Sequence, residues 1–121
     1  MPGVEQLLDR IISFSDEKKA SKIVAYNVKE RSSLTEFVLI IGARNNIHCR
    51  ALSENIRDEI GKYLKDVSTD DFYSPKKSGN AESGWVVLDI NSIIVHIICE
   101  DIRSYYALDE LYQSVSEVYH L

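Results

Sequence analysis

Residues Trp85–Cys99, with the sequence WVVLDINSIIVHIIC, decide the fold. Apolar and β-branched residues fill both ends of this stretch and predict two strands, over 85–90 and 93–99. Asn91 and Ser92 lie between them and suit a two-residue turn. The stretch therefore predicts a β-hairpin.

Further strands are predicted upstream of the hairpin. Ile23–Val28 is a β-branched and aromatic run. Phe37–Ile41 is apolar at every position, which predicts a central strand covered on both faces. Asp71–Tyr73 predicts a short strand, which gives a sheet of about five strands. Ser74–Ser83, rich in Lys, Pro, Gly and small polar residues, predicts a mobile loop.

Three apolar stripes with helical spacing predict helices around these strands. The first is Val4, Leu7, Leu8, Ile11 and Ile12, and should end near residues 13–16. The second, capped by Asn45 or Asn46, is Ile47, Leu52, Ile56, Ile60, Tyr63 and Leu64. The third, from Ile102 to about Val118, is Tyr105, Leu108, Tyr112, Val115 and Tyr119. The order α-β-β-α-β-β-β-α predicts a single α/β domain over residues 1–121, with a mixed sheet packed by helices.

The charge distribution limits the partners of this 121-residue chain, whose formal net charge is −5. Residues 1–60 carry nine basic and nine acidic side chains, whereas residues 61–121 carry five and ten. The acidic half is unsuited to binding a phosphate backbone. It is compatible with a basic protein partner, and equally with simple solubility. The first residues lack a secretory pattern, so we expect a cytoplasmic protein with reduced, buried cysteines at Cys49 and Cys99.

The sequence offers little for catalysis or metal binding. The candidate metal ligands, at spacings unsuited to chelation, are His48, Cys49, His96, Cys99 and His120. Gly42–Asn46 joins a strand to a helix, where phosphates often bind, but it matches no nucleotide motif. We therefore expect no enzymatic activity, no cofactor and no metal. A nucleotide-binding or nucleotidyltransferase-like enzyme using this loop is the alternative.

Aromatic residues instead indicate a binding surface. The chain has seven tyrosines and one tryptophan, and Tyr, Trp and Arg are frequent anchors of protein interfaces. Trp85, Tyr105, Tyr106 and Arg103 lie together with several acids in the last third of the sequence. The alternative is that all of these aromatic side chains belong to the core.

Spaced motifs run through the same region. They are Gly79-(five residues)-Trp85-Val86-Val87-Leu88-Asp89, Val95-His96-Ile97, and Arg103-x-x-Tyr106-x-Leu108-Asp109-x-Leu111-Tyr112. Upstream lie Lys18-Lys19-Ala20-x-x-Ile23, Asn27-Val28 and Phe37–Gly42. Together, over roughly residues 5–115, these motifs resemble the ribosomal silencing factor family, also called Iojap.

The resemblance implies a nucleotidyltransferase-like fold without the catalytic residues, and a repressor of translation. Family members bind the large ribosomal subunit through its fourteenth protein and sterically block subunit joining. A homodimer is also implied. The residues expected at or just behind the partner surface are Trp85, Asp89, His96, Glu100, Asp101, Arg103, Tyr106, Leu108, Asp109 and Tyr112.

A third hypothesis is direct RNA binding through basic side chains. Its candidates are Lys18, Lys19, Lys22, Lys76 and Lys77. Because residues 1–60 have no net positive charge, we expect at most accessory contacts to ribosomal RNA.

Overall fold

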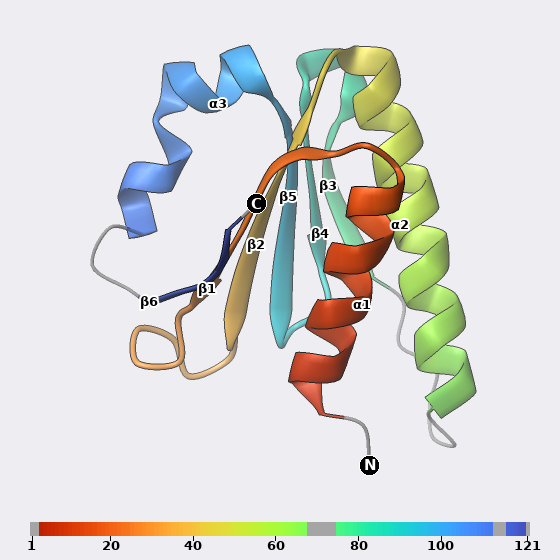
Figure 1. The fold of residues 1–121 in the computed structure, drawn as a ribbon, viewed down its shortest axis with the longest axis vertical. Helices are drawn as coiled ribbons and strands as arrows, with labels where there is room; N and C mark the ends of the chain where they lie inside the picture. Colours follow the sequence, from red (N-terminus) through yellow and green to blue (C-terminus); the bar gives the residue numbers. More distant parts are fainter. Residues whose placement is uncertain (1–2, 68–74, 113–115, 121) are drawn as a thin grey trace.

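A computed structural model of the chain describes residues 3–67, 75–112 and 116–120. Its elements follow one another along a single α/β domain (Figure 1). They are α1 (Val4–Glu17), β1 (Ser21–Asn27), β2 (Phe37–Ala43), α2 (Asn46–Val67), β3 (Lys76–Asn80), the 3₁₀ turn η1 (Ala81–Ser83), β4 (Trp85–Asp89), β5 (Ile93–Cys99), α3 (Glu100–Tyr106), the 3₁₀ turn η2 (Leu108–Tyr112) and β6 (Ser116–His120).

The described strands form one mixed sheet in the order β3-β4-β5-β2-β1-β6. β2 runs parallel to β5, and every other neighbouring pair is antiparallel. All seven residues of β2 are buried, which confirms the predicted central strand. The hairpin predicted from residues 85–99 is confirmed as β4 and β5, with Asn91 in the left-handed conformation at φ 66° in the turn. The strand predicted at 71–73 lies outside the described residues.

The two faces of the sheet are covered differently. α1 and α2 lie side by side over one face, where Ile11, Leu52 and Ile97 are almost completely buried (Figure 1). α3 and η2 lie on the opposite side of the sheet, where Leu108 packs with Ile40 in a second, smaller core. This asymmetry leaves part of the second face accessible.

The start of α2 shows how local chemistry sets a helix boundary. Asn45 Oδ1 accepts a hydrogen bond from the backbone N–H of His48 at 2.8 Å, so Asn45 caps the helix as predicted. The prediction that Ile47 belongs to the buried stripe of this helix is wrong. Its side chain is 82% exposed. It precedes Leu52 by five residues, which turns the two side chains roughly 140° apart on a helix.

The last part of the chain differs from the predicted helix over 102–118. α3 ends at Tyr106, because Ala107 adopts the left-handed conformation at φ 50° and ψ 46°. The chain continues through η2 into β6, which pairs with β1. This pairing satisfies backbone N–H and C=O groups along an edge of β1 that would otherwise be open.

The loop predicted over 74–83 is likewise wrong for its described part. Residues 76–80 form the edge strand β3, paired with β4, and residues 81–83 form η1. Gly79 permits this pairing at φ 74°, since a Cβ there would lie 2.3 Å from the Trp85 carbonyl oxygen. β3 consists of four polar residues and one glycine, all exposed, and has no apolar alternation to indicate a strand, because an edge strand does not require one.

Replacing Ala107 with glycine is expected to raise the free energy of unfolding by about 0.5–1 kcal/mol, because glycine adopts the left-handed conformation without a Cβ penalty. Urea unfolding measures the effect. Ala51→Gly, at an exposed position inside α2, is the matched control and should destabilise by about 1 kcal/mol. Equal destabilisation by both substitutions would contradict the assigned role of Ala107.

Candidate protein-binding surface

An aromatic group lies where β4 and β5 meet the end of α3. Trp85 Nε1 donates a hydrogen bond to His96 Nδ1 at 3.1 Å, linking the first residue of β4 to the middle of β5. The rings of Trp85 and Tyr106 lie 5.4 Å apart, and Tyr105 meets Tyr106 edge-on at 5.0 Å. We call Trp85, His96, Tyr105 and Tyr106 the aromatic surface.

Burial and the hydrogen bond from Trp85 together determine the protonation state and the tautomer of His96. Burial lowers the pKa of His96 to about 4, so the imidazole is neutral at pH 7. Nδ1 accepts the indole proton, and the ring proton is therefore on Nε2. His96 orients Trp85 and contributes no charge to the surface.

The sheet around this group is open on the side away from α1 and α2. Along β4, Val86 and Leu88 face the helices and are fully buried. Trp85, Val87 and Asp89 alternate with them and are only half-buried. Tyr105 and Tyr106 are 81% and 58% exposed, respectively. Large exposed aromatic side chains beside an open sheet face are typical of a surface that binds another macromolecule.

Three of the four predicted acidic residues lie at two places, the hairpin turn and the start of α3. Asp89 Oδ1 accepts from the backbone N–H of Asn91 at 2.8 Å and stabilises the hairpin turn. The Glu100 carboxylate accepts from Ser21 Oγ at 2.9 Å and lies 3.9 Å from Lys22 Nζ. Asp101 is exposed at the start of α3 and, with Glu100, lines an open cavity of about 660 Å³ beside the start of α2.

The other predicted residues fasten α3 and η2 to the sheet. The Arg103 side chain is 7% exposed and forms two hydrogen bonds to the Asp109 carboxylate, at 2.7 and 2.8 Å. Arg103 Nη1 also donates to the Lys22 carbonyl oxygen at 2.8 Å. Tyr26 donates to Asp109 Oδ1 at 3.0 Å. The Arg103 hydrogen bonds lower the pKa of Asp109, which stays ionised at neutral pH.

Leu108 and Tyr112 complete this attachment. Leu108 is 3% exposed, and the Tyr112 ring stacks on Tyr26 with centroids 5.0 Å apart. Burial raises the pKa of Tyr112, so its hydroxyl stays protonated. The structure therefore brings Trp85, His96 and Tyr106 together at an accessible surface. Within α3 and η2, the side chains that contact the sheet are those of Arg103, Leu108, Asp109 and Tyr112. The contribution of Tyr26 had no signal in the sequence, because its partners are distant along the chain.

The Gly42 loop has a packing explanation. A Cβ on Gly42 would lie 2.6 Å from Ser21 Oγ and 2.8 Å from the Ser21 carbonyl oxygen, so only glycine fits against β1. Among the described residues, no three His, Cys, Asp or Glu side chains form a group able to hold a metal ion. No observation at this loop favours nucleotide chemistry.

The two cysteines are buried and unpaired, as predicted. Burial raises the pKa of the Cys49 thiol to about 11 and also raises that of Cys99, so both are protonated at neutral pH.

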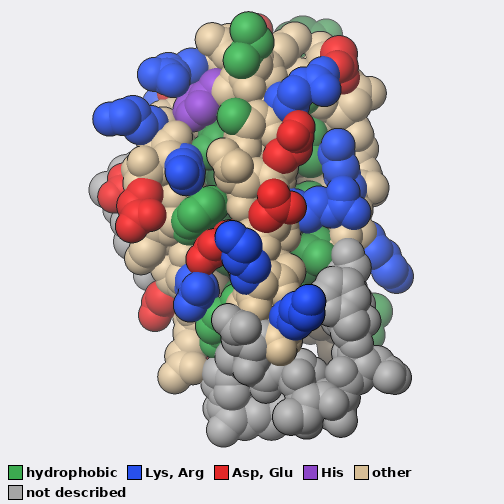
Figure 2. All heavy atoms as spheres, turned by 90° about the vertical axis from the view of Figure 1, so that its right-hand side faces the viewer, with side chains coloured by type: hydrophobic (Ala, Val, Ile, Leu, Met, Phe, Trp, Pro, Cys, Tyr) green, Lys and Arg blue, Asp and Glu red, His purple; other side chains and the backbone are tan. Residues whose placement is uncertain are grey.

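The lysines of the RNA hypothesis are spread over the molecule. Lys18 and Lys19 follow α1, and Lys22 is in β1 beside Glu100. Lys76 and Lys77 are in β3, which three strands separate from β1. Figure 2, which views the side formed by α1 and α2, shows basic and acidic side chains interspersed over it.

None of the described helices is long and apolar enough to cross a membrane.

The fold and this surface define a class of protein. It is a mixed α/β domain with α1 and α2 packed on one face of its sheet, and with the short α3 and accessible aromatic side chains on the other. The family model described as "Ribosomal silencing factor during starvation" matches residues 2–120, and the chain belongs to this RsfS family. The family consists of regulatory proteins.

Individual relatives agree with the family match. The ribosomal silencing factor RsfS of Halalkalibacterium halodurans is 31% identical over 109 residues, covering 89% of this chain and 86% of the relative. The chloroplastic protein Iojap of Zea mays is 27% identical over 104 residues, covering 86% of this chain and 42% of that protein. A crystal structure from Chromobacterium violaceum shares the fold, with a TM-score of 0.77, 19% identity and coverage of 98% and 94%.

Proposed function

We propose that this protein binds the large ribosomal subunit through its fourteenth protein and sterically prevents joining of the small subunit in the cytoplasm, which represses translation. Membership of the ribosomal silencing factor family supports the ribosome as the target. The observation that carries the choice of surface is the contact of Trp85 with both His96 and the exposed Tyr106.

The chemistry of this surface suits a basic protein partner. Trp85 and Tyr106 offer large apolar area with few rotatable bonds, which makes them effective anchors. Glu100 and Asp101, at the start of α3, supply negative charge at the same end of the sheet as Trp85, whereas Asp89 lies at the hairpin end. Attraction to a basic protein speeds encounter. Steric blocking needs no catalytic group, so a small domain that occupies the joining face is sufficient.

A subunit-joining assay tests the proposal. Purified small and large subunits are mixed with saturating protein and separated on a sucrose gradient. We expect the protein to sediment with the large subunit and the peak of joined ribosomes to fall. Unchanged joining at saturating protein would overturn the proposed function. Magnesium-dependent nucleotide binding, measured by calorimetry without any effect on joining, would favour the enzymatic alternative.

A further inference from the structure

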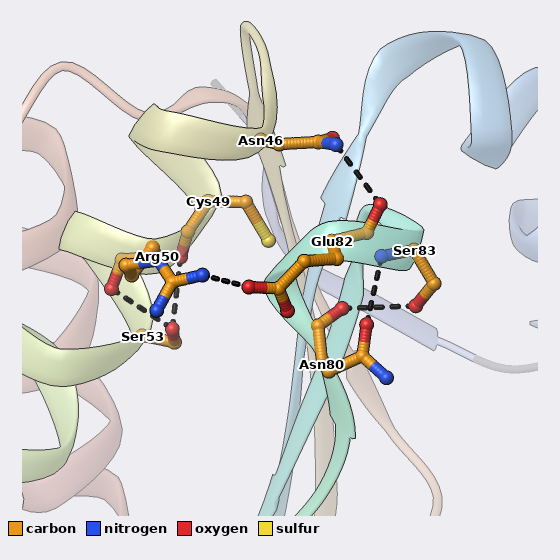
Figure 3. A network of polar contacts seen from close by, with 7 residues as sticks. All are labelled: Asn46, Cys49, Arg50, Ser53, Asn80, Glu82 and Ser83. Atoms are coloured by element: carbon orange, nitrogen blue, oxygen red, sulfur yellow. Dashed lines mark hydrogen bonds and ion pairs between the residues drawn. The ribbon is translucent and has the colours of Figure 1, made fainter.

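A polar network joins the first turns of α2 to the corner between β3 and β4 (Figure 3). From α2, Asn46 Nδ2 donates to the Glu82 carbonyl oxygen at 2.9 Å, and Arg50 pairs with the Glu82 carboxylate. Within the corner, Asn80 Oδ1 accepts from the Ser83 backbone N–H at 2.8 Å. We call Asn46, Arg50 and Glu82 the corner clasp.

The corner that the clasp holds leads directly into Trp85. Gly84 links η1 to Trp85 at φ 81°, and its N–H donates to the Ala81 carbonyl oxygen at 3.0 Å. The Gly84 carbonyl oxygen accepts from the Cys99 N–H at 2.8 Å. Gly84 is packed closely, because a Cβ there would lie 3.2 Å from Ile102 Cγ1 and 3.3 Å from Cys99 Sγ. The backbone before Trp85 is thus held by α2 on one side and by β5 on the other.

The indole of Trp85 must reach both His96 and Tyr106 across the open face of the sheet. Whether the indole contacts both residues depends on the position of the Trp85 backbone at the start of β4. The preceding turn η1, through Gly84, determines that position. We propose that Asn46 and Arg50 are positioning residues, which act through Glu82 to hold the Trp85 side chain in its partner-binding orientation. This inference rests on the proposed function.

A local role is favoured over a general contribution to stability. The Arg50 and Glu82 side chains are 57% and 69% exposed, and exposed ion pairs contribute little to the free energy of unfolding. The chain offers a control in Arg10 and Glu59, a partly exposed pair between α1 and α2 whose atoms lie 3.0 Å apart. That pair lies on the helical side of the sheet, away from Trp85.

Charge reversal and restoration test the proposal. Arg50→Glu places two carboxylates together, and we expect it to weaken binding to large subunits about tenfold while leaving the urea-unfolding midpoint nearly unchanged. The double variant R50E/E82R restores an opposite pair and should bind within about twofold of the parent. Arg10→Glu, the control, should bind like the parent.

Fluorescence provides a second readout, because Trp85 is the only tryptophan in the chain. In the free protein, Arg50→Glu should increase acrylamide quenching of Trp85 and lower its fluorescence anisotropy, and R50E/E82R should reverse both changes. Parent-like quenching and affinity in Arg50→Glu, or a defect that Glu82→Arg does not repair, would overturn the positioning role. If instead Trp85→Ala itself binds normally, the proposed surface fails, and the two failures are distinguishable.

Discussion

Replacing Trp85 with alanine is expected to weaken binding to the large ribosomal subunit about 30-fold, equivalent to roughly 2 kcal/mol. The indole is half-buried between His96 and Tyr106, so its removal takes away an anchor and leaves Tyr106 without its ring contact. Co-sedimentation with large subunits over a range of protein concentrations measures the loss. The same variant should also lose most of its effect on subunit joining.

Two control substitutions separate the anchor from general effects. Trp85→Phe keeps an aromatic ring but lacks the Nε1–H that His96 accepts, so an intermediate affinity is expected. Leu34→Ala removes a side chain that is 82% exposed in the β1–β2 connection, at the opposite end of the sheet from Trp85, and should bind normally. A folded Trp85→Ala protein that binds as tightly as the parent would contradict the surface assignment.

Replacing Arg103 with alanine is expected to lower the free energy of unfolding by about 2–3 kcal/mol. This is at or below the lower limit of the range of about 3–5 kcal/mol for breaking a fully buried ion pair, because Asp109 remains partly exposed. The substitution removes both hydrogen bonds to Asp109 and leaves the Lys22 carbonyl oxygen without this donor. Urea unfolding gives the change. Arg103→Lys keeps the charge without the two-pronged geometry and should fall between parent and alanine variant. Arg10→Ala, at the partly exposed pair with Glu59, should change stability by less than about 1 kcal/mol.

The pH dependence of this loss identifies its cause. Hydrogen bonds from Arg103 lower the pKa of Asp109 in the folded state, so the stability it contributes is present above the unfolded-state value of about 3.9. That contribution is lost as the pH falls through the lower folded-state pKa. The difference between parent and Arg103→Ala should therefore be largest at neutral pH and shrink below about pH 4. A difference independent of pH would indicate that lost packing, rather than the ion pair, dominates.

The sequence predicted the elements whose burial is reflected in an apolar pattern. Phe37–Ile41 is apolar throughout because β2 is covered on both faces, and Asn45 precedes α2 because a side-chain oxygen is needed there. The hairpin of β4 and β5 could be predicted in the same way, from two apolar runs separated by Asn91 and Ser92. Each of these features depends on local sequence alone.

The failures occurred where distant parts of the chain decide the structure. The aromatic stripe after residue 102 has helical spacing, yet Ala107 turns the chain and β1 provides an edge for β6 to pair with. β3 consists of four exposed polar residues and one exposed glycine, and only its pairing with β4 makes it a strand. Neither partner can be identified from the local pattern.

The aromatic surface could be predicted in part, from residues that differ from their neighbours in the sequence. Trp85 and His96 interrupt apolar strands and therefore stand out, and Tyr106 belongs to the same spaced motifs. The sequence could not separate exposed anchors from supporting residues. In the sequence, Arg103 resembles a surface side chain. In the structure it is buried and donates to the Lys22 carbonyl oxygen at the bulged start of β1, a partner that the sequence does not indicate.

The parallel pairing of β2 with β5 has a consequence for folding during synthesis of the chain. Residues 37–43 leave the ribosome early, but their partners at 93–99 follow only after α2, β3 and β4 have been synthesised. Such a distant contact closes late, since the long intervening segment must first be made and its ends brought together. The strand carrying His96 is also the strand that completes the centre of the sheet. We therefore expect the nascent chain to be unable to engage its target until β5 has been translated and has paired with β2.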